Sequence, residues 1–378
     1  MRIGFDAKKI VSNMTGIGNY SRGLVNLLSA DGADSCVLFA PGQGKPECRR
    51  LLVENDNTEY RFFGGHGALQ REYWRNRGIV KDIRESGVEL FHGLSNELPW
   101  GIEKAGIPTA VTIHDLIFLR IPEMYGAADR MILKLKTKHA CRVATRIAAM
   151  SEQTKRDLVD FYGVDPARID VLYQGCDAGF KRRVGEAELQ TLREKYDLPE
   201  RYIIAVGTIE ERKNQLRLVE AFSKIGGDTG LVIVSRRTPM QEAVEKRIRE
   251  LGIGDRVRIL NGIPFGDLPG LYQGSAMSAY MSRFEGFGIP VLEGITSRVP
   301  VLAATGSCLE EAGGPGAVYA DPLDVDGIAE KIREVLDDTA LRERLLRGGE
   351  EHLKRFADAT LRDEARRFYA RVAADFEK

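Results

Sequence analysis

Short apolar runs alternate along the chain with stretches that repeat apolar residues at helical spacing. The first half contains six runs of the kind that form buried strands: Arg2–Asp6, Ser35–Phe39, Val88–His92, Thr109–Ile113, Arg146–Met150 and Ile169–Tyr173. Because a helical stretch follows each run, the pattern predicts a parallel sheet with helices on both faces.

The alternation then starts again. A second set of strand candidates comprises Arg201–Val206, Gly230–Val234, Val257–Leu260, Met277–Tyr280, Pro300–Ala303 and Ala317–Tyr319. The polar stretch from Asp177 to Leu198 separates the two sets. We therefore expect two Rossmann-like domains, residues 1–177 and 178–358, with the linker near Asp177 and a final helix within residues 359–378, around Leu361–Phe376.

Composition narrows the class of protein. With 378 residues, 43% hydrophobic, the chain can bury two full cores, and its formal net charge of zero lacks the basic bias of a nucleic-acid binder. The N-terminus is charged from Arg2, and no apolar run approaches ~18 residues, so a cytoplasmic protein is expected. The five cysteines form no C-x-x-C pair, so we expect reduced, buried thiols rather than disulfides or a zinc site.

Two carboxylates, Glu285 and Glu293, bracket the run E-G-F-G-I-P-V-L-E. It follows a strand candidate and leads into the helical stretch Ile289–Ser297, so Gly286–Gly288 should form a strand-to-helix loop. Unpaired N–H groups at a helix start attract phosphate oxygens, whereas nearby carboxylates suit hydroxyl groups. The combination favours a nucleotide-sugar; the alternative is a strand-end acid and a solvated helix residue.

Two adjacent cations, Arg212 and Lys213, stand at a predicted helix entry in G-T-I-E-E-R-K-N, residues 207–214. The helix dipole disfavours cations there unless an anion lies nearby. A cation about 4 Å from a phosphate oxygen contributes roughly 1 to 4 kcal/mol, more than the 0.3 to 1 typical of a helix end. We expect the two side chains to dominate diphosphate binding; the alternative is a pair of ordinary surface cations.

Together these segments resemble the retaining glycosyltransferases of family 4, which have the GT-B fold of two facing Rossmann-like domains with a cleft between them. The resemblance spans nearly the whole chain. Further matches are T-I-H-D-L at residues 112–116, M-T-G-I-G-N-Y at 14–20, M-S-E-Q-T-K at 150–155 and Y-A-D-P-L-D at 319–324. Thr208 departs from the family, where Arg commonly follows the glycine, so phosphate neutralisation would rest more heavily on Arg212 and Lys213. The family also implies that the last helix crosses back to the first domain.

The resemblance implies a role for each site residue. Glu285 would bind the donor sugar, Glu293 the ribose, and His114 would lie beside the transferred sugar; the alternative for His114 is a satisfied polar residue at a strand end. Arg212 and Lys213 would neutralise the diphosphate, and backbone N–H groups of Gly286, Phe287 and Gly288 would bind the sugar and diphosphate. Closure of the cleft near the phosphate and acceptor would involve Gly16, Gly18 and Tyr20. Separately, we expect backbone groups of the loops near Arg236 and at Asn261–Pro264, including Ile263, to contact the base.

The expected reaction is attack of an acceptor hydroxyl on the anomeric carbon of a hexose, with retained configuration and loss of a nucleoside diphosphate. GDP-mannose is the favoured donor, a glycan or lipid-linked glycan the expected acceptor, and no metal or other cofactor is expected. Asp324 and Asp326 precede a helical stretch and are interpreted as capping residues. Alternatives are a sugar-nucleotide epimerase, a nicotinamide dehydrogenase, which the incomplete G-x-G-x-x-G disfavours, and a non-catalytic sugar-nucleotide binding protein.

A basic segment runs from Arg130 to Arg146, with six cations, no acid and interspersed apolar residues. Such a helix could contact anionic lipid headgroups at the inner face of a membrane, which would suit a lipid-linked acceptor. The alternative is a solvated basic face. His92 could line the acceptor side of the cleft, and no role is assigned to it.

Overall fold

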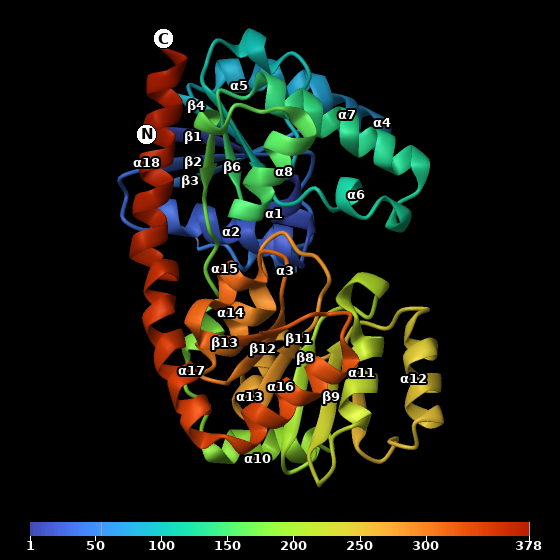
Figure 1. The fold of residues 1–378 in the computed structure, drawn as a ribbon. Helices are drawn as coiled ribbons and strands as arrows, with labels where there is room; N and C mark the ends of the chain where they lie inside the picture. The colour runs from blue at the N-terminus through green and yellow to red at the C-terminus, as the bar shows by residue number, and fades with distance from the viewer. Residues whose placement is uncertain (54, 378) are drawn as a thin grey trace. The chain divides into compact units, whose positions relative to one another are not determined.

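The computed structural model describes residues 1–53 and 55–377, and the chain divides into two compact units (Figure 1). The first unit combines Met1–Gly175 with the segment from Ala357 onward, and the second is Cys176–Phe356. The final residue of the expected segment 359–378, Lys378, lies outside the described residues. The polar stretch after Asp177 forms two helices, α9 Ala178–Lys181 and α10 Glu186–Lys195.

The first unit is built on a seven-stranded parallel sheet in the order β3-β2-β1-β4-β5-β6-β7. Its strands are β1 Arg2–Asp6, β2 Ser35–Ala40, β3 Thr58–Phe62, β4 Leu90–Gly93, β5 Thr109–Ile113, β6 Arg146–Ala149 and β7 Ile169–Val171. Its helices are α1 Lys8–Ser12, α2 Gly16–Ser29, α3 Pro46–Arg49, α4 Ala68–Tyr73, the π-helix η1 Trp74–Gly78, α5 Ile79–Glu85, η2 Ile102–Ala105, α6 Ile117–Arg120, η3 Pro122–Met124, α7 Ala127–Val143, α8 Glu152–Tyr162, η4 Pro166–Arg168 and α18 Asp358–Phe376.

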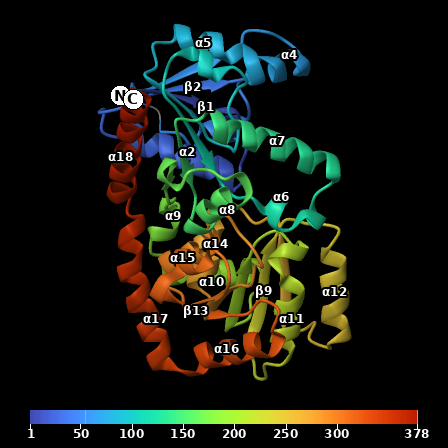
Figure 2. The same ribbon diagram turned by 45° about the horizontal axis from the view of Figure 1, so that its top comes forward.

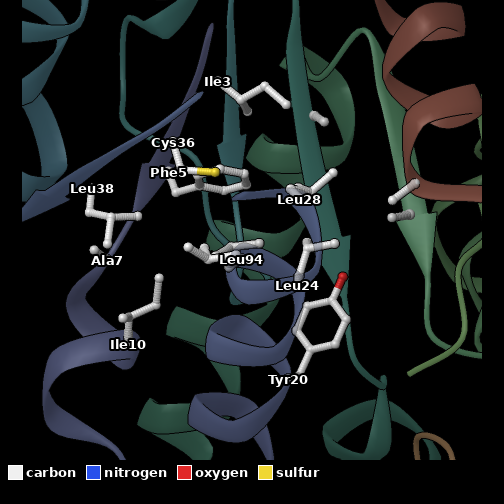
Figure 3. Packing of buried hydrophobic residues seen from close by; sticks show 14 of the residues in the cluster. Ile3, Phe5, Ala7, Ile10, Tyr20, Leu24, Leu28, Cys36, Leu38 and Leu94 are labelled. Atoms are coloured by element: carbon white, nitrogen blue, oxygen red, sulfur yellow. The ribbon is translucent and has the colours of Figure 1, made fainter. Parts of the chain in front are cut away.

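Side chains of alternate strand residues fill the two faces of this sheet, as a period of two requires. Ile3 and Phe5 belong to a core shared with α2 and α18, whereas Val37 and Phe39 belong to a core on the opposite face. Figure 3 shows Tyr20, Leu24 and Leu28, each about one helical turn apart on α2, projecting into the first of these cores. The helix α18 lies beside α2, and both chain termini are found in this unit (Figure 2).

The second unit has a six-stranded parallel sheet in the order β10-β9-β8-β11-β12-β13. Its strands are β8 Tyr202–Val206, β9 Gly230–Ser235, β10 Val257–Asn261, β11 Met277–Tyr280, β12 Val301–Ala304 and β13 Ala317–Ala320. Its helices are α9 Ala178–Lys181, α10 Glu186–Lys195, η5 Glu211–Lys213, α11 Gln215–Ser223, α12 Gln241–Glu250, η6 Phe265–Asp267, α13 Leu268–Gln273, α14 Ile289–Thr296, α15 Leu309–Gly313, η7 Gly314–Gly316, α16 Val325–Asp337, α17 Thr339–His352 and η8 Leu353–Phe356.

All twelve predicted strands are present, with ends that differ from the prediction by at most two residues. The strand that was not predicted is β3, T-E-Y-R-F, whose residues are half-buried or exposed at the edge of the first sheet. Its alternating polar and apolar residues lack the continuous apolar run that identifies an interior strand. Within the described residues, no helix is both long and apolar enough to cross a membrane.

Candidate functional site

Both sheets have the strand order of a doubly wound fold, in which ligands bind where the order reverses, beyond the carboxyl ends of the strands. In the second unit that point lies between β8 and β11. The segment after β8 carries Arg212 and Lys213, and the segment after β11 carries Glu285. The sheet topology therefore brings together cations and a carboxylate about 70 residues apart in sequence.

Glu285 is the centre of this group. Its Oε1 lies 2.6 Å from Lys213 Nζ and 2.7 Å from Arg212 Nη1, and it also accepts hydrogen bonds from Tyr280 at 2.8 Å and Ser282 at 2.6 Å. Lys213 also donates to the hydroxyl of Tyr280. Arg212 further pairs with Glu210 at 2.7 Å. The side chains of Arg212 and Lys213 are only 12% and 15% exposed, so they are not ordinary surface cations.

The structure corrects one element of the charge argument. The sequence suggested that a bound anion must offset the two cations, but two carboxylates of the protein, Glu285 and Glu210, already do so. Burial would raise the pKa of Glu285, yet Lys213 and Arg212 outweigh it and lower that pKa to about 2. Glu285 is therefore ionised throughout the physiological range.

The loop from Gly286 to Gly288 does join a strand to a helix, as expected. Gly288 precedes α14 with φ +120°, and a Cβ there would lie 2.7 Å from Leu309, so only glycine fits without strain. Pro290 occupies the first turn, where its missing N–H costs nothing. The side chain of Phe287 is buried against Phe356, which leaves its backbone as the part able to contact a ligand.

Glu293 lies inside α14 and is only 8% exposed, so the alternative of a solvated helix residue is wrong. The Tyr272 hydroxyl donates to its Oε2 at 3.1 Å. Burial raises the pKa of Glu293 to about 7, with Tyr272 opposing the shift and Asp177 adding to it. No cation pairs with Glu293 within the described residues, so it differs from Glu285 in being held close to its titration point.

In the first unit, His114 follows β5 and is buried. Its Nε2 lies 2.8 Å from the Leu94 carbonyl oxygen and so carries the hydrogen, which leaves Nδ1 as the acceptor. The Tyr20 ring packs edge-on against His114 with centroids 5.0 Å apart. Burial lowers the pKa of His114 to about 4, so the imidazole is neutral near pH 7.

The two glycines of M-T-G-I-G-N-Y differ in their surroundings. Gly18 is buried, and a Cβ there would lie 1.9 Å from the carbonyl oxygen of Asn13. Gly16, the first residue of α2, is exposed and a Cβ would meet nothing within 4 Å. Close backbone packing therefore accounts for Gly18, whereas packing within the protein gives no reason for a glycine at position 16.

Ile263 and His92 have different surroundings. Ile263 is half-buried in the loop after β10, an edge strand that β9 and β8 separate from β11. His92 is fully buried between Thr112 and Tyr369, so the idea that it lines a cleft is wrong. Its place in the alternating strand pattern points it into the core.

Only part of the basic segment from Arg130 to Arg146 lies on the surface of a helix. α7 ends at Val143, and Arg146 belongs to β6, where it is buried and paired with Asp170 and Asp375. The prediction of one basic surface extending to Arg146 is therefore wrong. Lys136 pairs with Glu97 at 3.0 Å. The exposed residues of α7 include three apolar side chains and three cations: Met131, Ile132, Leu135, Lys134, Lys138 and Arg142.

Asp324 accepts hydrogen bonds from the backbone N–H groups of Asp326 and Gly327, which confirms that it caps α16. The capping role predicted for Asp326 is wrong, because Asp326 lies inside the first turn of α16 and pairs with Lys224. Residues 1–53 and 55–377 contain no group of three or more His, Cys, Asp or Glu side chains placed to hold a metal ion. The five cysteines are free and buried, as predicted.

Sequence reasoning missed the hydroxyl groups that surround the two glutamates. The sequence pattern predicts only a strand ending at Tyr280 and indicates no role for Ser282 or Tyr272, although all three donate to these glutamates. The signal available for Tyr280 was a polar aromatic residue at the end of a buried strand, five residues before Glu285.

The sequence matches two families. Residues 14–180 match the family described as Glycosyltransferase Family 4, and residues 190–352 match Glycosyl transferases group 1. Among similar curated proteins, the O-antigen chain mannosyltransferase B of Escherichia coli is 27% identical over 94% of this chain and 96% of its own length. The D-inositol 3-phosphate glycosyltransferase of Salinispora tropica is 31% identical over 74% of this chain and 64% of its own.

Solved structures show the same fold. Anabaena HepE, crystallised with UDP and glucose, aligns with a TM-score of 0.76 at 17% identity, covering 98% of this chain and 99% of that one. A sucrose-phosphate synthase from Thermosynechococcus elongatus aligns with the same TM-score at 18% identity, covering 99% of both chains.

Proposed function

The chain belongs to the family 4 glycosyltransferases with the GT-B fold, and on that premise we propose that it transfers mannose from GDP-mannose to a hydroxyl of a glycan or lipid-linked glycan, with retention of configuration. The observation that carries the proposal is the group formed by Glu285, Arg212 and Lys213 at the strand-order reversal of the second sheet. The group supplies cationic N–H donors for a leaving diphosphate and a carboxylate for sugar hydroxyls.

Lys213 retains capacity for a ligand. Its ammonium group has three N–H donors, and its hydrogen-bond partners among the described residues are Tyr280 and Glu285. A third donor is thus free to meet a phosphate oxygen without breaking the existing pairs. Because Glu285 holds the ammonium group in place beforehand, little reorganisation is needed as charge develops on the leaving group.

Glu293 suits ribose recognition. Its carboxyl group is buried, lacks a cation, and has one hydrogen-bond partner, Tyr272, among the described residues. Hydroxyl groups of a ribose would satisfy the remaining acceptor sites and favour the ionised form. Neutral His114 in the first unit would act as a hydrogen-bonding residue toward the sugar rather than as a cation.

The choice of mannose rests on relatives. The O-antigen chain mannosyltransferases B and RfbU and the serotype-specific mannosyltransferase WbdA share 25% to 27% identity with this chain. HepE, by contrast, was crystallised with UDP and glucose, so UDP-glucose is the first competing donor.

A donor panel tests the proposal. The protein is incubated with GDP-mannose, UDP-glucose and UDP-galactose, with and without mannose-containing glycans, and the release of nucleoside diphosphate and the product are measured. We expect GDP to be released from GDP-mannose, at a rate that the acceptor increases. Because configuration is retained, NMR of the anomeric proton should show an α-linked product from the α-linked donor. Conversion of the nucleotide-sugar to its epimer without acceptor would support the epimerase alternative. Release of UDP from UDP-glucose or UDP-galactose, without release of GDP from GDP-mannose, would show that the donor is a UDP-sugar. The matched variants are Glu285→Gln, expected to be inactive, and Glu350→Gln, an exposed carboxylate with normal activity.

The exposed residues of α7 suit contact with a membrane surface, where a lipid-linked acceptor would be found. Met131, Ile132 and Leu135 are more than half exposed beside Lys134 and Lys138, a combination that suits an anionic lipid surface. Each cation near such a surface is worth about 1 kcal/mol. Lys134→Glu/Lys138→Glu should abolish cosedimentation with anionic vesicles, whereas Lys246→Glu, exposed on α12, should not. Equal sedimentation of all three proteins would contradict this contact.

A further inference from the structure

Four buried side chains of the first unit form a continuous chain of hydrogen bonds. The Tyr369 hydroxyl of α18 lies 2.9 Å from His92 Nδ1, His92 Nε2 lies 2.9 Å from Thr112 Oγ1, and that oxygen lies 2.9 Å from the Tyr20 hydroxyl of α2. These residues have no other side-chain hydrogen-bond partners among the residues that the structure describes. We call this set the buried relay.

The direction of the relay follows from its two ends. Burial lowers the pKa of His92 to about 3, so its ring is neutral and has one donor and one acceptor nitrogen. If every hydrogen bond ran toward Tyr369, the hydroxyl hydrogen of Tyr369, which is 2% exposed, would have no acceptor within the described protein. An unsatisfied buried donor costs about 1–3 kcal/mol.

The opposite direction moves the unpaired hydrogen from Tyr369 to the other end of the relay, at Tyr20. Tyr369 then donates to His92 Nδ1, His92 Nε2–H donates to Thr112, and Thr112 donates to the oxygen of Tyr20. The free hydrogen is now that of Tyr20, the most exposed member at 6% and the one in contact with His114. Thr112 and His114 stand at the carboxyl end of β5, the edge of the sheet where ligands bind.

We infer that the buried relay commits the Tyr20 hydroxyl to donate its hydrogen to an oxygen of the bound donor or acceptor, with Thr112, His92 and Tyr369 as positioning residues. This inference rests on the proposed function, since the donor or acceptor of that reaction is the ligand that would accept the hydrogen bond. The relay starts on α18, so the last helix of the chain sets the hydrogen-bonding direction of a residue near its start. The phenol of Tyr20 keeps its hydrogen because burial raises its pKa to about 12.

The first test determines the direction of the hydrogen bonds in the buried relay without measuring catalysis. Nitrogen-15 NMR of the imidazole side chains, with His92→Asn used to identify the signals, reports which ring nitrogen carries the hydrogen. We expect the Nε2–H form of His92. The Nδ1–H form would overturn the inference, whatever the donor panel shows, so the two failures are distinguishable.

The second test uses transfer kinetics. Tyr20→Phe keeps the ring against His114 and should lower kcat/KM about tenfold, as expected for a lost hydrogen bond to a ligand. Tyr369→Phe should lower kcat/KM less, and the double variant no more than Tyr20→Phe alone, because Tyr369 acts through Tyr20. Additive losses would overturn the inference.

Two further variants separate positioning from stability. Thr112→Ser retains the bridging hydroxyl and should keep activity, whereas Thr112→Val should resemble Tyr20→Phe. Tyr202→Phe removes a comparable buried hydrogen bond, 2.7 Å to the Leu271 carbonyl, and should leave kcat/KM unchanged. Equal activity of the serine and valine variants would contradict the relay.

Discussion

Lys213 Nζ lies 2.6 Å from Glu285 Oε1, so the cation expected to receive the leaving diphosphate is already paired inside the protein. Removal of one partner leaves the other charge buried and less compensated. For a pair with side chains 15% and 12% exposed, the single variants Lys213→Ala and Glu285→Gln should each lose most transfer and also lower the free energy of unfolding, by an amount that can reach 3–5 kcal/mol.

The double variant separates the two effects. It should remain inactive but recover part of the stability, because neither charge is then left without its partner. The control is Lys224→Ala, which breaks an exposed pair with Asp326 and should cost at most about 1 kcal/mol. Urea unfolding gives the stabilities. Purely additive losses would show that the pair is not coupled.

The carboxyl group of Glu293 predicts a pH dependence of stability. Its pKa is about 7 in the folded protein and 4.5 in the unfolded reference, so the unfolded chain releases the proton first. The contribution of Glu293 to the free energy of unfolding is therefore fully present below pH 4.5. It falls by on the order of 3 kcal/mol as the pH rises to about 7. Glu293→Gln should flatten urea-unfolding stability across this range; parallel curves for the two proteins would contradict the buried, unpaired carboxyl group.

His114 predicts a dependence of opposite sign. Burial lowers its pKa from 6.5 to about 4, so acidification protonates the unfolded chain first. The contribution to stability is present above pH 6.5 and is lost as the pH falls toward 4. Between pH 7 and pH 5, the free energy of unfolding should fall less for His114→Asn than for the wild type in urea unfolding. The matched control is His66→Asn, at an exposed position, whose free energy of unfolding should follow that of the wild type. An unchanged slope for His114→Asn would contradict a buried neutral imidazole.

Gly16 and Gly18 offer a matched pair of alanine variants. Gly18→Ala would place a methyl group 1.9 Å from the Asn13 carbonyl oxygen and should cost 1–3 kcal/mol or more. Gly16→Ala meets nothing within 4 Å and should leave stability within about 0.5 kcal/mol. If Gly16→Ala nevertheless weakens donor binding in a thermal-shift titration, the absence of a side chain at position 16 serves the approach of a ligand rather than packing within the protein. Equal stability losses in the two variants would contradict the described packing.

The fold was largely predictable because its interior strands are continuous apolar runs flanked by helices, a pattern that directly reflects burial on both faces of a parallel sheet. The site was predictable where motif and topology coincide, as for Glu285 after β11 and Arg212 after β8. Their direct pairing was not, since no local pattern specifies which of the protein's own carboxylates approaches a given cation. The same limit applies to His92, whose partners Thr112 and Tyr369 lie 20 and 277 residues away.

The helix α18 completes the core of the unit that contains the N-terminus. Phe368, Tyr369 and Val372 pack in one cluster with Ile3 and Phe5. During synthesis on the ribosome, the first unit therefore emerges early but lacks part of its interior until α18 has left the exit tunnel. The second unit is contiguous in sequence and can reach its native state first, so the order of folding should be the reverse of the order of translation.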